Sequence, residues 1–348
     1  MASDLPASTA IVILNWNGRK YLEKFLPGVI AHSGGCRVVV ADNASQDDSV
    51  AFIRQHFPGV ELVLHAQNLG FCEGYNQALR LIAAEYYVLL NSDVEVTPDW
   101  TRPILALMAD NPLIAACQPK IKCYQNRRLF EYAGAGGGFI DFLGYPFCRG
   151  RVFETLEEDR GQYNDTAPVF WATGACMFIR AAAFHQAGGL EPAFFAHMEE
   201  IDLCWRLQLS GYQVMYCGQS EVYHVGGGTL PKSNSRKTFL NFRNGLAMLY
   251  KNVPPDVLYK VLPVRILLDW VAALKFLTDG DFKSTVAVLK AHADCWRHRK
   301  YWQAQRRRQP ALHQQLKGIY RQSVVWDYFI NRKKHFRDLE SGDISGEW

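Results

Sequence analysis

Two acidic clusters contain the side chains most able to do chemistry. The first is Asn91-Ser92-Asp93-Val94-Glu95, which directly follows an apolar run. A carboxylate at the end of a strand, such as Asp93, is suited to a hard divalent cation that it would share with phosphate groups. The alternative is a purely structural role, in which the carboxylate caps the turn before Pro98. The motif alone does not decide between these readings.

The second cluster is His197-Met198-Glu199-Glu200-Ile201-Asp202, which has three carboxylates within four residues at the start of a predicted helix. Acidic residues are favoured at helix N-termini, so capping is one explanation. Adjacent carboxylates also repel each other, which raises the pKa of one of them and makes it a usable general base. Both explanations stay open at this point.

Two further patterns could hold a ligand. A neutral His224, just before three glycines, could complete a metal site, although a single histidine is more often an ordinary surface or core residue. Asn68-Leu69-Gly70-Phe71, followed by Gly74 and Asn76, offers two glycines for close backbone approach and two amides for hydrogen bonds. The alternative is a turn followed by a helix.

The elements that position these residues have an α/β pattern. Apolar, β-branched runs predict buried strands, and segments of helix-forming composition lie between them. The alternation predicts parallel strands joined by right-handed crossovers, a Rossmann-like arrangement in which ligands bind at the carboxyl ends of the strands. The expected strands are 9–14, 37–41 and 86–90, and the expected helices are 19–32, 46–56 and 74–85.

Three polar clusters follow these strands and should converge on one edge of the sheet: Asn15-Trp16-Asn17-Gly18, Asp42-Asn43-Ala44-Ser45 and Asn91-Ser92-Asp93. Residues 120–168, rich in glycine and aromatics, are expected to be irregular. Residues 225–237 have the composition of a mobile loop whose Lys232 and Arg236 could close over phosphates. A solvated basic linker is the alternative for that loop.

The composition is that of an ordinary globular protein, because 49% of the 348 residues are hydrophobic and 21% are charged. Nine cysteines without a C-x-x-C pair give no disulfide framework and favour a reducing compartment. The N-terminus has no secretory signal pattern, and the longest apolar stretch is interrupted by charges. We therefore expect a cytoplasmic protein.

Taken in order, the motifs resemble those of the family-2 inverting glycosyltransferases of GT-A fold, and most closely their bacterial rhamnosyltransferase-like branch. The motifs are Ile-Leu-Asn-Trp-Asn-Gly, Val-Val-Ala-Asp-Asn-Ala-Ser, Asn-Leu-Gly-Phe-x-x-Gly-x-Asn, Asn-Ser-Asp-Val-Glu, Thr-Gly-Ala-Cys and Phe-Phe-x-x-x-Glu-Glu-Ile-Asp-Leu-Cys-Trp-Arg. The resemblance covers about residues 8–250. It implies a mostly parallel central sheet in a domain of residues 1–237, followed by a helical, basic extension over residues 238–348.

The resemblance also implies roles for individual residues. Asp93 matches the last carboxylate of the family's D-x-D motif, and His224 matches a third metal position. The metal, Mg²⁺ or Mn²⁺, would bridge the donor's two phosphates. Two departures are visible: Asn91 replaces the first D-x-D aspartate, and Glu200 stands where the family usually has an aspartate base. The expected donor contacts are Asn15, Asn17, Asp42, Asn43, Asn68, Gly74, Asn76, Ser92, Lys232 and Arg236, and the expected catalytic group is Glu200 with Glu199 and Asp202.

The expected reaction is transfer of a sugar, with inversion, from a nucleotide diphosphate to a hydroxyl of a glycan or lipid-linked acceptor, with dTDP-rhamnose as the favoured donor. Two alternatives stay open. A nucleotidyltransferase would attack phosphorus and release pyrophosphate, and a non-catalytic relative would only bind sugar nucleotide or glycan.

The C-terminal extension indicates an anionic partner. Residues 232–348 carry 22 Lys and Arg against 10 Asp and Glu. On a helix, Leu262, Ile266, Trp270, Leu274 and Leu277 share one face and Lys260, Arg265 and Lys275 the other, which is the pattern of a helix lying on an anionic membrane. A helix packed on the catalytic domain is the alternative, and nucleic acid is not expected as a partner.

Overall fold

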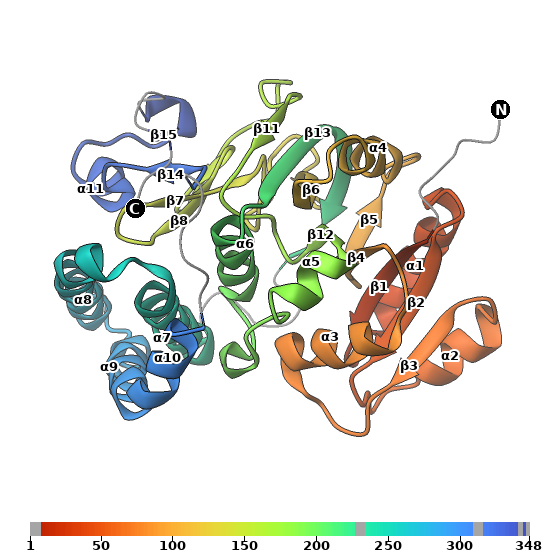
Figure 1. Ribbon diagram of the computed structural model, residues 1–348, viewed down its shortest axis with the longest axis horizontal. Coiled ribbons are helices and arrows are strands. Elements are labelled where there is room, and N and C mark those ends of the chain that lie inside the picture. Colours follow the sequence, from red (N-terminus) through yellow and green to blue (C-terminus); the bar gives the residue numbers. More distant parts are fainter. Residues whose placement is uncertain (1–7, 227–233, 309–315, 340–343, 346–348) are drawn as a thin grey trace.

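The computed structural model describes residues 8–226, 234–308, 316–339 and 344–345 (Figure 1). Its first part is a parallel α/β unit. Four parallel strands lie in the order β3-β2-β1-β4. These strands are β1 (Thr9–Asn15), β2 (Arg37–Asp42), β3 (Glu61–Leu64) and β4 (Tyr86–Asn91), and the helices between them are α1 (Arg19–His32), α2 (Ser49–His56) and α3 (Gly70–Leu81). The three expected strands and the helix at 19–32 are thereby confirmed.

Helix α3 differs from the expected range of 74–85, since it begins and ends four residues earlier. Its start is fixed by the side chain of Asn68, whose Oδ1 accepts a hydrogen bond from the backbone N–H of Gly70 at 2.9 Å. Its end is fixed at Ile82, which has extended backbone angles.

The central sheet continues beyond β4 in mixed orientation, in the order β12-β6-β13-β11, and β5 pairs with β13. Strand β12 runs antiparallel to both β4 and β6, and β11 and β5 run antiparallel to β13, whereas β13 is parallel to β6. The expected parallel strands thus form one part of a sheet of mixed orientation. The additional elements are β5 (Val94–Val96), α4 (Arg102–Asp110), β6 (Ile114–Cys123), β11 (Thr166–Pro168), β12 (Cys176–Arg180), α5 (Ala181–Gln186), η1 (Pro192–Phe194), α6 (Glu199–Leu209) and β13 (Gln213–His224).

Helices cover both faces of this sheet, and β1 shows why. Its residues alternate between two cores: Ile11 and Ile13 face the core under α1 and α4, whereas Ala10 and Val12 face the core under α3 and α6. A strand buried on both faces is apolar along its whole length, which explains the continuous apolar runs in the sequence.

Residues 120–168 are not simply irregular, because part of this segment forms a second, small sheet. Gly144 and Gly150 adopt positive φ angles of 78° and 87°, which allow the tight turns between its short strands. The strands are β7 (Gly138–Asp141), β8 (Pro146–Cys148), β9 (Arg151–Val152) and β10 (Thr155–Leu156), and they are joined by β14 (Ile319–Tyr320) and β15 (Ile344–Ser345) from the C-terminal part.

The expected helical extension is present. Its elements are α7 (Ser235–Asn252), α8 (Pro255–Thr278), α9 (Phe282–Arg297), α10 (Arg299–Arg306), α11 (Val324–Phe329) and η2 (Phe336–Asp338). Helices α7–α10 form a lobe beside α6, whereas α11 and η2 lie with the small sheet (Figure 1). Among the described residues, no helix combines the length and apolar composition needed to cross a bilayer. The domain division at 237/238 stays a prediction, and α7 begins just before it.

Candidate functional site

The sheet brings the three polar clusters together at the carboxyl ends of β2, β1 and β4. Asn15 lies opposite Asp42 in the pairing of β1 with β2, and Leu14 lies opposite Asn91 in the pairing of β1 with β4. Since all three strands are parallel, their ends meet at one edge, where ligands of such sheets bind.

At this edge, Asn15 and Asp42 form a closed network with Ser45. The Asn15 amide Nδ2 donates to Asp42 Oδ2 at 3.0 Å and to Ser45 Oγ at 3.1 Å, and the Ser45 N–H donates to the other oxygen of Asp42. Asn17, with a positive φ of 53°, accepts a bond from the N–H of Gln46. Asn15 and Asp42 are almost fully buried, so these side chains shape the loops of the edge.

A second network joins Asn43 to the loop before α3. The Asn43 amide donates to Asn68 Oδ1 at 3.1 Å and to the carbonyl of Gly70 at 3.0 Å. A Cβ atom at Gly74 would lie 3.1 Å from the Leu14 side chain and 3.2 Å from Asn43 Nδ2, so this glycine permits close packing. Asn76 is used elsewhere, because both atoms of its amide bond the backbone of Leu190.

One exposed residue at this edge was quoted in the sequence motif but given no role. Trp16 directly follows β1 and is 50% exposed, unlike its buried neighbour Asn15. A large aromatic ring left in solvent beside a ligand edge is suited to stacking on a planar ligand. Its presence in the Asn-Trp-Asn-Gly motif is the signal that could have identified it.

Asp93 and His224 lie together, and a third residue joins them. His224 Nε2 lies 3.2 Å from Asp93 Oδ1 and 3.5 Å from the Asn91 amide, while its Nδ1 lies 3.3 Å from Glu131 Oε2. Asp93, Glu131 and His224 are all at least 90% buried. Glu131 belongs to no motif, and we find no signal in the sequence that could have singled it out.

The two carboxylates control the charge of this histidine. Burial by itself lowers the pKa of His224, but the hydrogen bonds and charges of Asp93 and Glu131 outweigh it and raise the pKa to about 10. Burial acts against both carboxylates as well, yet the bond to His224 leaves the pKa values of Asp93 and Glu131 below their ordinary values. The three side chains therefore form a buried imidazolium held between two carboxylates.

We tested whether these side chains fit a divalent metal. In the described ranges, no group of three or more His, Cys, Asp and Glu side chains has the spacing of a metal site. The 3.2 Å between Asp93 Oδ1 and His224 Nε2 does suit two neighbouring ligands of an octahedral ion, which lie about 3 Å apart when each bond is about 2.1 Å. The pair therefore fits a metal that takes its other ligands from phosphates and water, and binding would displace the Nε2 proton.

The remaining predicted donor contacts have mixed positions. Ser92 lies in the turn after β4, and its Oγ is 3.4 Å from the position of a Cβ atom built at Gly18. The Arg236 guanidinium lies 4.8 Å from the centre of the Phe195 ring, close to the loop that precedes Glu199 and Glu200. Lys232 lies outside the described residues.

The acidic pair begins α6. Glu199 is buried and Glu200 is partly exposed, and Oε2 of each has no hydrogen-bond partner among the residues described. Burial raises the pKa of Glu200 to about 7, whereas burial and the charge of Glu200 raise that of Glu199 well above its ordinary value. A pKa of about 7 places Glu200 in the range where a general base works at neutral pH.

Asp202 has a different environment from the pair. It is fully buried, and Arg206, Lys251 and Asn252 donate to its oxygens at 2.9, 2.8 and 2.9 Å. Although burial acts in the opposite direction, the charges of Lys251 and Arg206 lower its pKa. We therefore assign Asp202 to the link between α6 and α7 rather than to the catalytic group.

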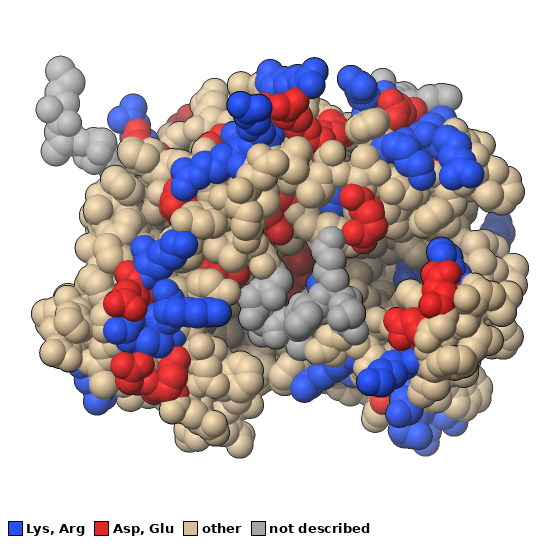
Figure 2. Space-filling model, turned by 180° about the vertical axis from the view of Figure 1, so that it is seen from behind, with Lys and Arg blue, Asp and Glu red and all other residues tan. Residues whose placement is uncertain are grey.

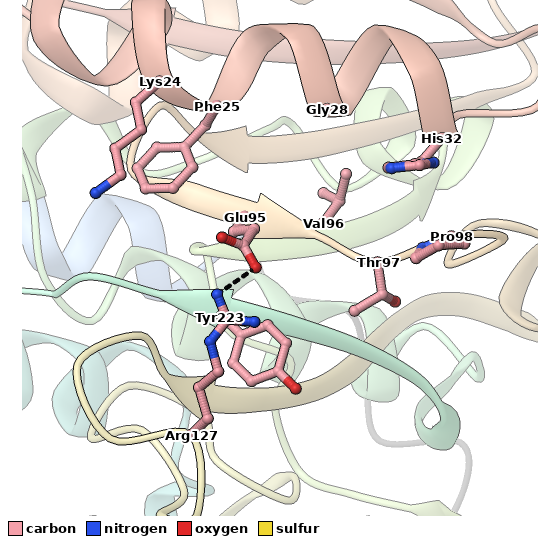
Figure 3. Close-up of a pocket in the computed structure, with 10 residues that line it drawn as sticks. All are labelled: Lys24, Phe25, Gly28, His32, Glu95, Val96, Thr97, Pro98, Arg127 and Tyr223. Atoms are coloured by element: carbon pink, nitrogen blue, oxygen red, sulfur yellow. Dashed lines mark hydrogen bonds and ion pairs between the residues drawn. The ribbon is translucent and has the colours of Figure 1, made fainter.

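A pocket of about 510 Å³ lies between α1 and the region of β5 and β13 (Figure 3). Arg127 and Glu95 form an ion pair across it at 2.7 Å. None of the sequence-predicted site residues lines this pocket. Its lining residues are Lys24, Phe25, Gly28, His32, Glu95, Val96, Thr97, Pro98, Arg127 and Tyr223.

Comparison with known proteins identifies one family. The model of glycosyl transferase family 2 matches residues 10–188, just over half of the chain. An N-acetylglucosaminyl-diphospho-decaprenol L-rhamnosyltransferase of Mycobacterium tuberculosis is 26% identical over 62% of this chain and 75% of its own length. The rhamnosyltransferase WbbL of Escherichia coli is 24% identical over 62% of this chain and 82% of its own length.

Solved structures support the fold. GalNAc-T7 with UDP, GalNAc and Mn²⁺ superposes with a TM-score of 0.57 at 15% identity, over 72% of this chain and 48% of that one. Mannosyltransferase PcManGT from Pyrobaculum calidifontis, with GDP-Man and Mn²⁺, has a TM-score of 0.50 at 13% identity, over 87% of this chain and 86% of that one. The expected GT-A fold is confirmed.

Proposed function

Because this chain belongs to glycosyl transferase family 2, we propose that it transfers a sugar from a nucleotide diphosphate donor to an acceptor hydroxyl with inversion at the anomeric carbon. Rhamnose from dTDP-rhamnose is the proposed sugar, and a lipid-linked diphospho-sugar is the proposed acceptor. The names of the mycobacterial and Escherichia coli relatives support this choice.

The observation that carries the proposal is the acidic pair beside the ligand edge, in which Glu199 is buried and Glu200 is partly exposed. Glu200, with its pKa raised to about 7 and a free Oε2, would accept the proton of the acceptor hydroxyl as that oxygen attacks the anomeric carbon. Burial and the charge of Glu200 raise the pKa of Glu199 well above its ordinary value, so the two carboxyl groups do not ionise independently. Attack from the side opposite the nucleotide would invert the configuration in a single displacement.

The donor would lie along the ends of β1, β2 and β4. We propose that Trp16 stacks on the base and that the Asn15–Asp42–Ser45 and Asn43–Asn68 networks fix the surrounding loops. Arg236 would meet the diphosphate, because it is held on Phe195 next to the acidic pair. The guanidinium suits phosphate oxygens by geometry as well as by charge.

Asp93 and His224 would hold the divalent metal, with Asn91 beside them. Such an ion supplies positive charge to the leaving diphosphate. The Mn²⁺ in the two solved structures supports this proposal. Glu131 would orient the imidazole through Nδ1, as outer carboxylates do at metal-bound histidines.

Incubation of the purified protein with a panel of nucleotide sugars, dTDP-rhamnose included, and a short-chain polyprenyl diphospho-N-acetylglucosamine tests the proposal. We expect release of the nucleoside diphosphate only in the presence of acceptor and Mg²⁺ or Mn²⁺, and NMR of the product should show inverted anomeric configuration. Release of pyrophosphate from a nucleoside triphosphate would instead indicate a nucleotidyltransferase. Absence of turnover with every donor would indicate a non-catalytic relative.

We also propose that the protein meets its acceptor at an anionic phospholipid bilayer through α8 and α9. Helix α8 has polar residues inside and apolar residues outside. Arg265 and Asp269 are at least 96% buried and bond each other at 2.9 Å, whereas Leu267, Trp270 and Leu274 are 57–61% exposed. The exposed apolar residues are Val264, Leu267, Trp270, Val271, Leu274 and Leu277 on α8, and Phe282, Val286, Leu289 and Trp296 on α9.

This face differs from the one expected from the sequence. Leu262 and Ile266, which the helical wheel placed on the membrane-facing side, are partly buried and do not belong to the exposed stripe. Arg265, which the wheel placed on the charged side, packs inward. Lys260 and Lys275, placed on the opposite face in that prediction, are exposed and lie on the same side of α8 as Val264 and Val271 by helical spacing.

The bilayer is the chosen partner because cations accompany the exposed apolar stripes. Lys283, Lys290 and Arg297 are exposed and recur along one flank of the α9 stripe. Viewed from behind, the helical lobe at lower right presents a largely uncharged edge with Lys and Arg side chains at its lower end (Figure 2). Apolar residues in the headgroup boundary and cations on anionic lipid are the two attractions that bind interfacial helices.

Co-sedimentation with vesicles tests this surface. Binding is expected to phosphatidylglycerol vesicles at low salt, with weaker binding to phosphatidylcholine and at high salt. The pair Leu267→Glu and Leu274→Glu should abolish binding, while Leu81→Glu, which changes a 73% exposed leucine elsewhere, should not. If the wild type does not bind anionic vesicles but self-associates in light scattering, the exposed face of α8 and α9 joins two copies of the protein instead. The cytoplasmic side of the membrane stays a prediction.

A further inference from the structure

The loop that delivers the acidic pair has an unusual backbone. Phe195, His197 and Met198 adopt positive φ angles of 66°, 71° and 70°, and α6 begins immediately afterwards at Glu199. Residues other than glycine rarely adopt such angles, and they do so only where surrounding contacts impose them. The position of Glu199 and Glu200 therefore depends on whatever holds this loop.

Four consecutive carbonyl groups of the loop, from Phe194 to His197, accept hydrogen bonds. On one side, the N–H groups of Phe71 and Cys72 donate to the carbonyl of Phe195 at 3.0 and 3.2 Å. The ring of Phe195 also packs against Gly70, where a Cβ atom would lie only 2.5 Å from it. The loop is thus fastened to the first turn of α3, which begins with the Asn-Leu-Gly-Phe motif.

On the other side, one amide group of the C-terminal extension lies within hydrogen-bond distance of the remaining three carbonyls. Asn244 of α7 is fully buried, and its Nδ2 lies 3.1 Å from the carbonyl of Phe194, 2.9 Å from that of Ala196 and 2.7 Å from that of His197. Arg243 donates to Asn244 Oδ1 at 2.7 Å and to the carbonyl of Phe194 at 3.1 Å. Because Arg243 occupies the amide oxygen, the Asn244 donors are directed at the loop.

We propose that Asn244 is a positioning residue for the transfer reaction: it fixes the loop at 194–198 so that Glu200 meets the acceptor hydroxyl. The proposal rests on the proposed role of Glu200 as the base. It makes α7 a structural part of the catalytic centre, although α7 lies in the extension. Small displacements of a catalytic group lower the rate strongly, because its geometry sets the probability of reaction.

The test compares Asn244→Ala with a matched control on the same helix. Asn252 is also a buried asparagine of α7, but its amide bonds Asp202 in the first turn of α6 and not the loop. We expect Asn244→Ala to lower kcat about 10–100-fold with the donor KM changed less than about threefold. Asn252→Ala should lower the melting temperature by a comparable amount and leave kcat within about twofold.

Hydrogen–deuterium exchange gives a second readout that needs no turnover. In Asn244→Ala, amides of residues 194–200 should exchange at least tenfold faster, while those of β1 and β4 should not change. If Asn244→Ala does not fold, Arg243→Met should produce the same pattern with a smaller loss of kcat. Unchanged exchange in the loop, or unchanged kcat despite a loosened loop, would overturn the proposal. Failure of the proposed function is distinguishable, because the wild type itself would then transfer no sugar.

Discussion

Replacement of Glu200 by glutamine should remove activity and increase stability at the same time. The amide keeps the shape of the side chain but cannot accept a proton, so turnover should fall by at least about a hundredfold while donor binding stays within about threefold. The gain in stability follows from the electrostatics. Burial raises the pKa of Glu200 from 4.5 to about 7, so the folded protein holds this proton more tightly than the unfolded chain.

The sign and size of this effect can be derived. A carboxyl group with a raised folded-state pKa adds no penalty below the unfolded value of about 4.5, and stability is lost as the pH rises from there to about 7. At 1.36 kcal/mol for each tenfold change in proton affinity, the penalty at pH 8 has an upper bound of about 3 kcal/mol. With an unfolding entropy of roughly 2.1 cal/mol/K per residue over 348 residues, this corresponds to a rise of about 4 °C in melting temperature.

Thermal unfolding of wild type and Glu200→Gln at pH 5 and pH 8 measures the effect. The variant should be more stable at pH 8, and the difference should fall to about 1 kcal/mol or less at pH 5, where Glu200 is protonated in the folded state. Glu199→Gln is the matched control, and it should retain much more activity. If Glu200→Gln is inactive but no more stable than the wild type at pH 8, the inference that burial raises the pKa of Glu200 is refuted. If Glu199→Gln is inactive and Glu200→Gln is active, the base is Glu199 and not Glu200.

Three further variants and one control test the donor side. Asp93→Ala should lower the rate of transfer about a hundredfold or more. The control Glu95→Ala, which loses only a partly exposed ion pair with Arg127, should not lower it. Near-normal transfer by Asp93→Ala with the same metal dependence would contradict the metal assignment. Glu131→Gln should raise the metal concentration for half-maximal activity about 10–100-fold, measured by Mn²⁺ titration, and an unchanged titration would remove Glu131 from the site. Trp16→Ala should raise the donor KM about tenfold with little change in kcat, if base stacking contributes about 1–3 kcal/mol; an unchanged KM would exclude stacking.

Local sequence pattern was sufficient to predict the parallel α/β unit and the edge at which its ligands bind. Strands buried on both faces must be apolar along their length, so 9–14, 37–41 and 86–90 were recognisable from local pattern alone. Parallel connection then required that the polar residues after these strands converge. The order of the motifs was sufficient to indicate the family, which the match over residues 10–188 confirms.

Long-range partners were decided only by the tertiary structure. Glu131 reaches His224 across 93 positions of sequence, and Asn244 reaches the carbonyls of the 194–198 loop across almost 50. No periodicity links residues so far apart, and neither residue belongs to a motif. Asp202 shows the same limit, because its sequence position beside Glu199 and Glu200 led us to expect a catalytic role. Its partner Lys251, from α7, shows that its charge is already compensated.

Helix α8 gives the clearest physical reason for the difference. Its apolar and charged residues are not segregated to opposite faces, so the helical wheel alone could not determine which side packs against the protein. Folding places Arg265 and Asp269 inside because Tyr145 and His292 lie within hydrogen-bond distance of Asp269, and the carbonyls of Leu143 and Gly144 accept from Arg265. A buried charge is tolerated only where such partners exist. Sequence fixes which residues can be charged or apolar, whereas the partners that make burial of a charge possible come from distant segments that only the folded chain brings together.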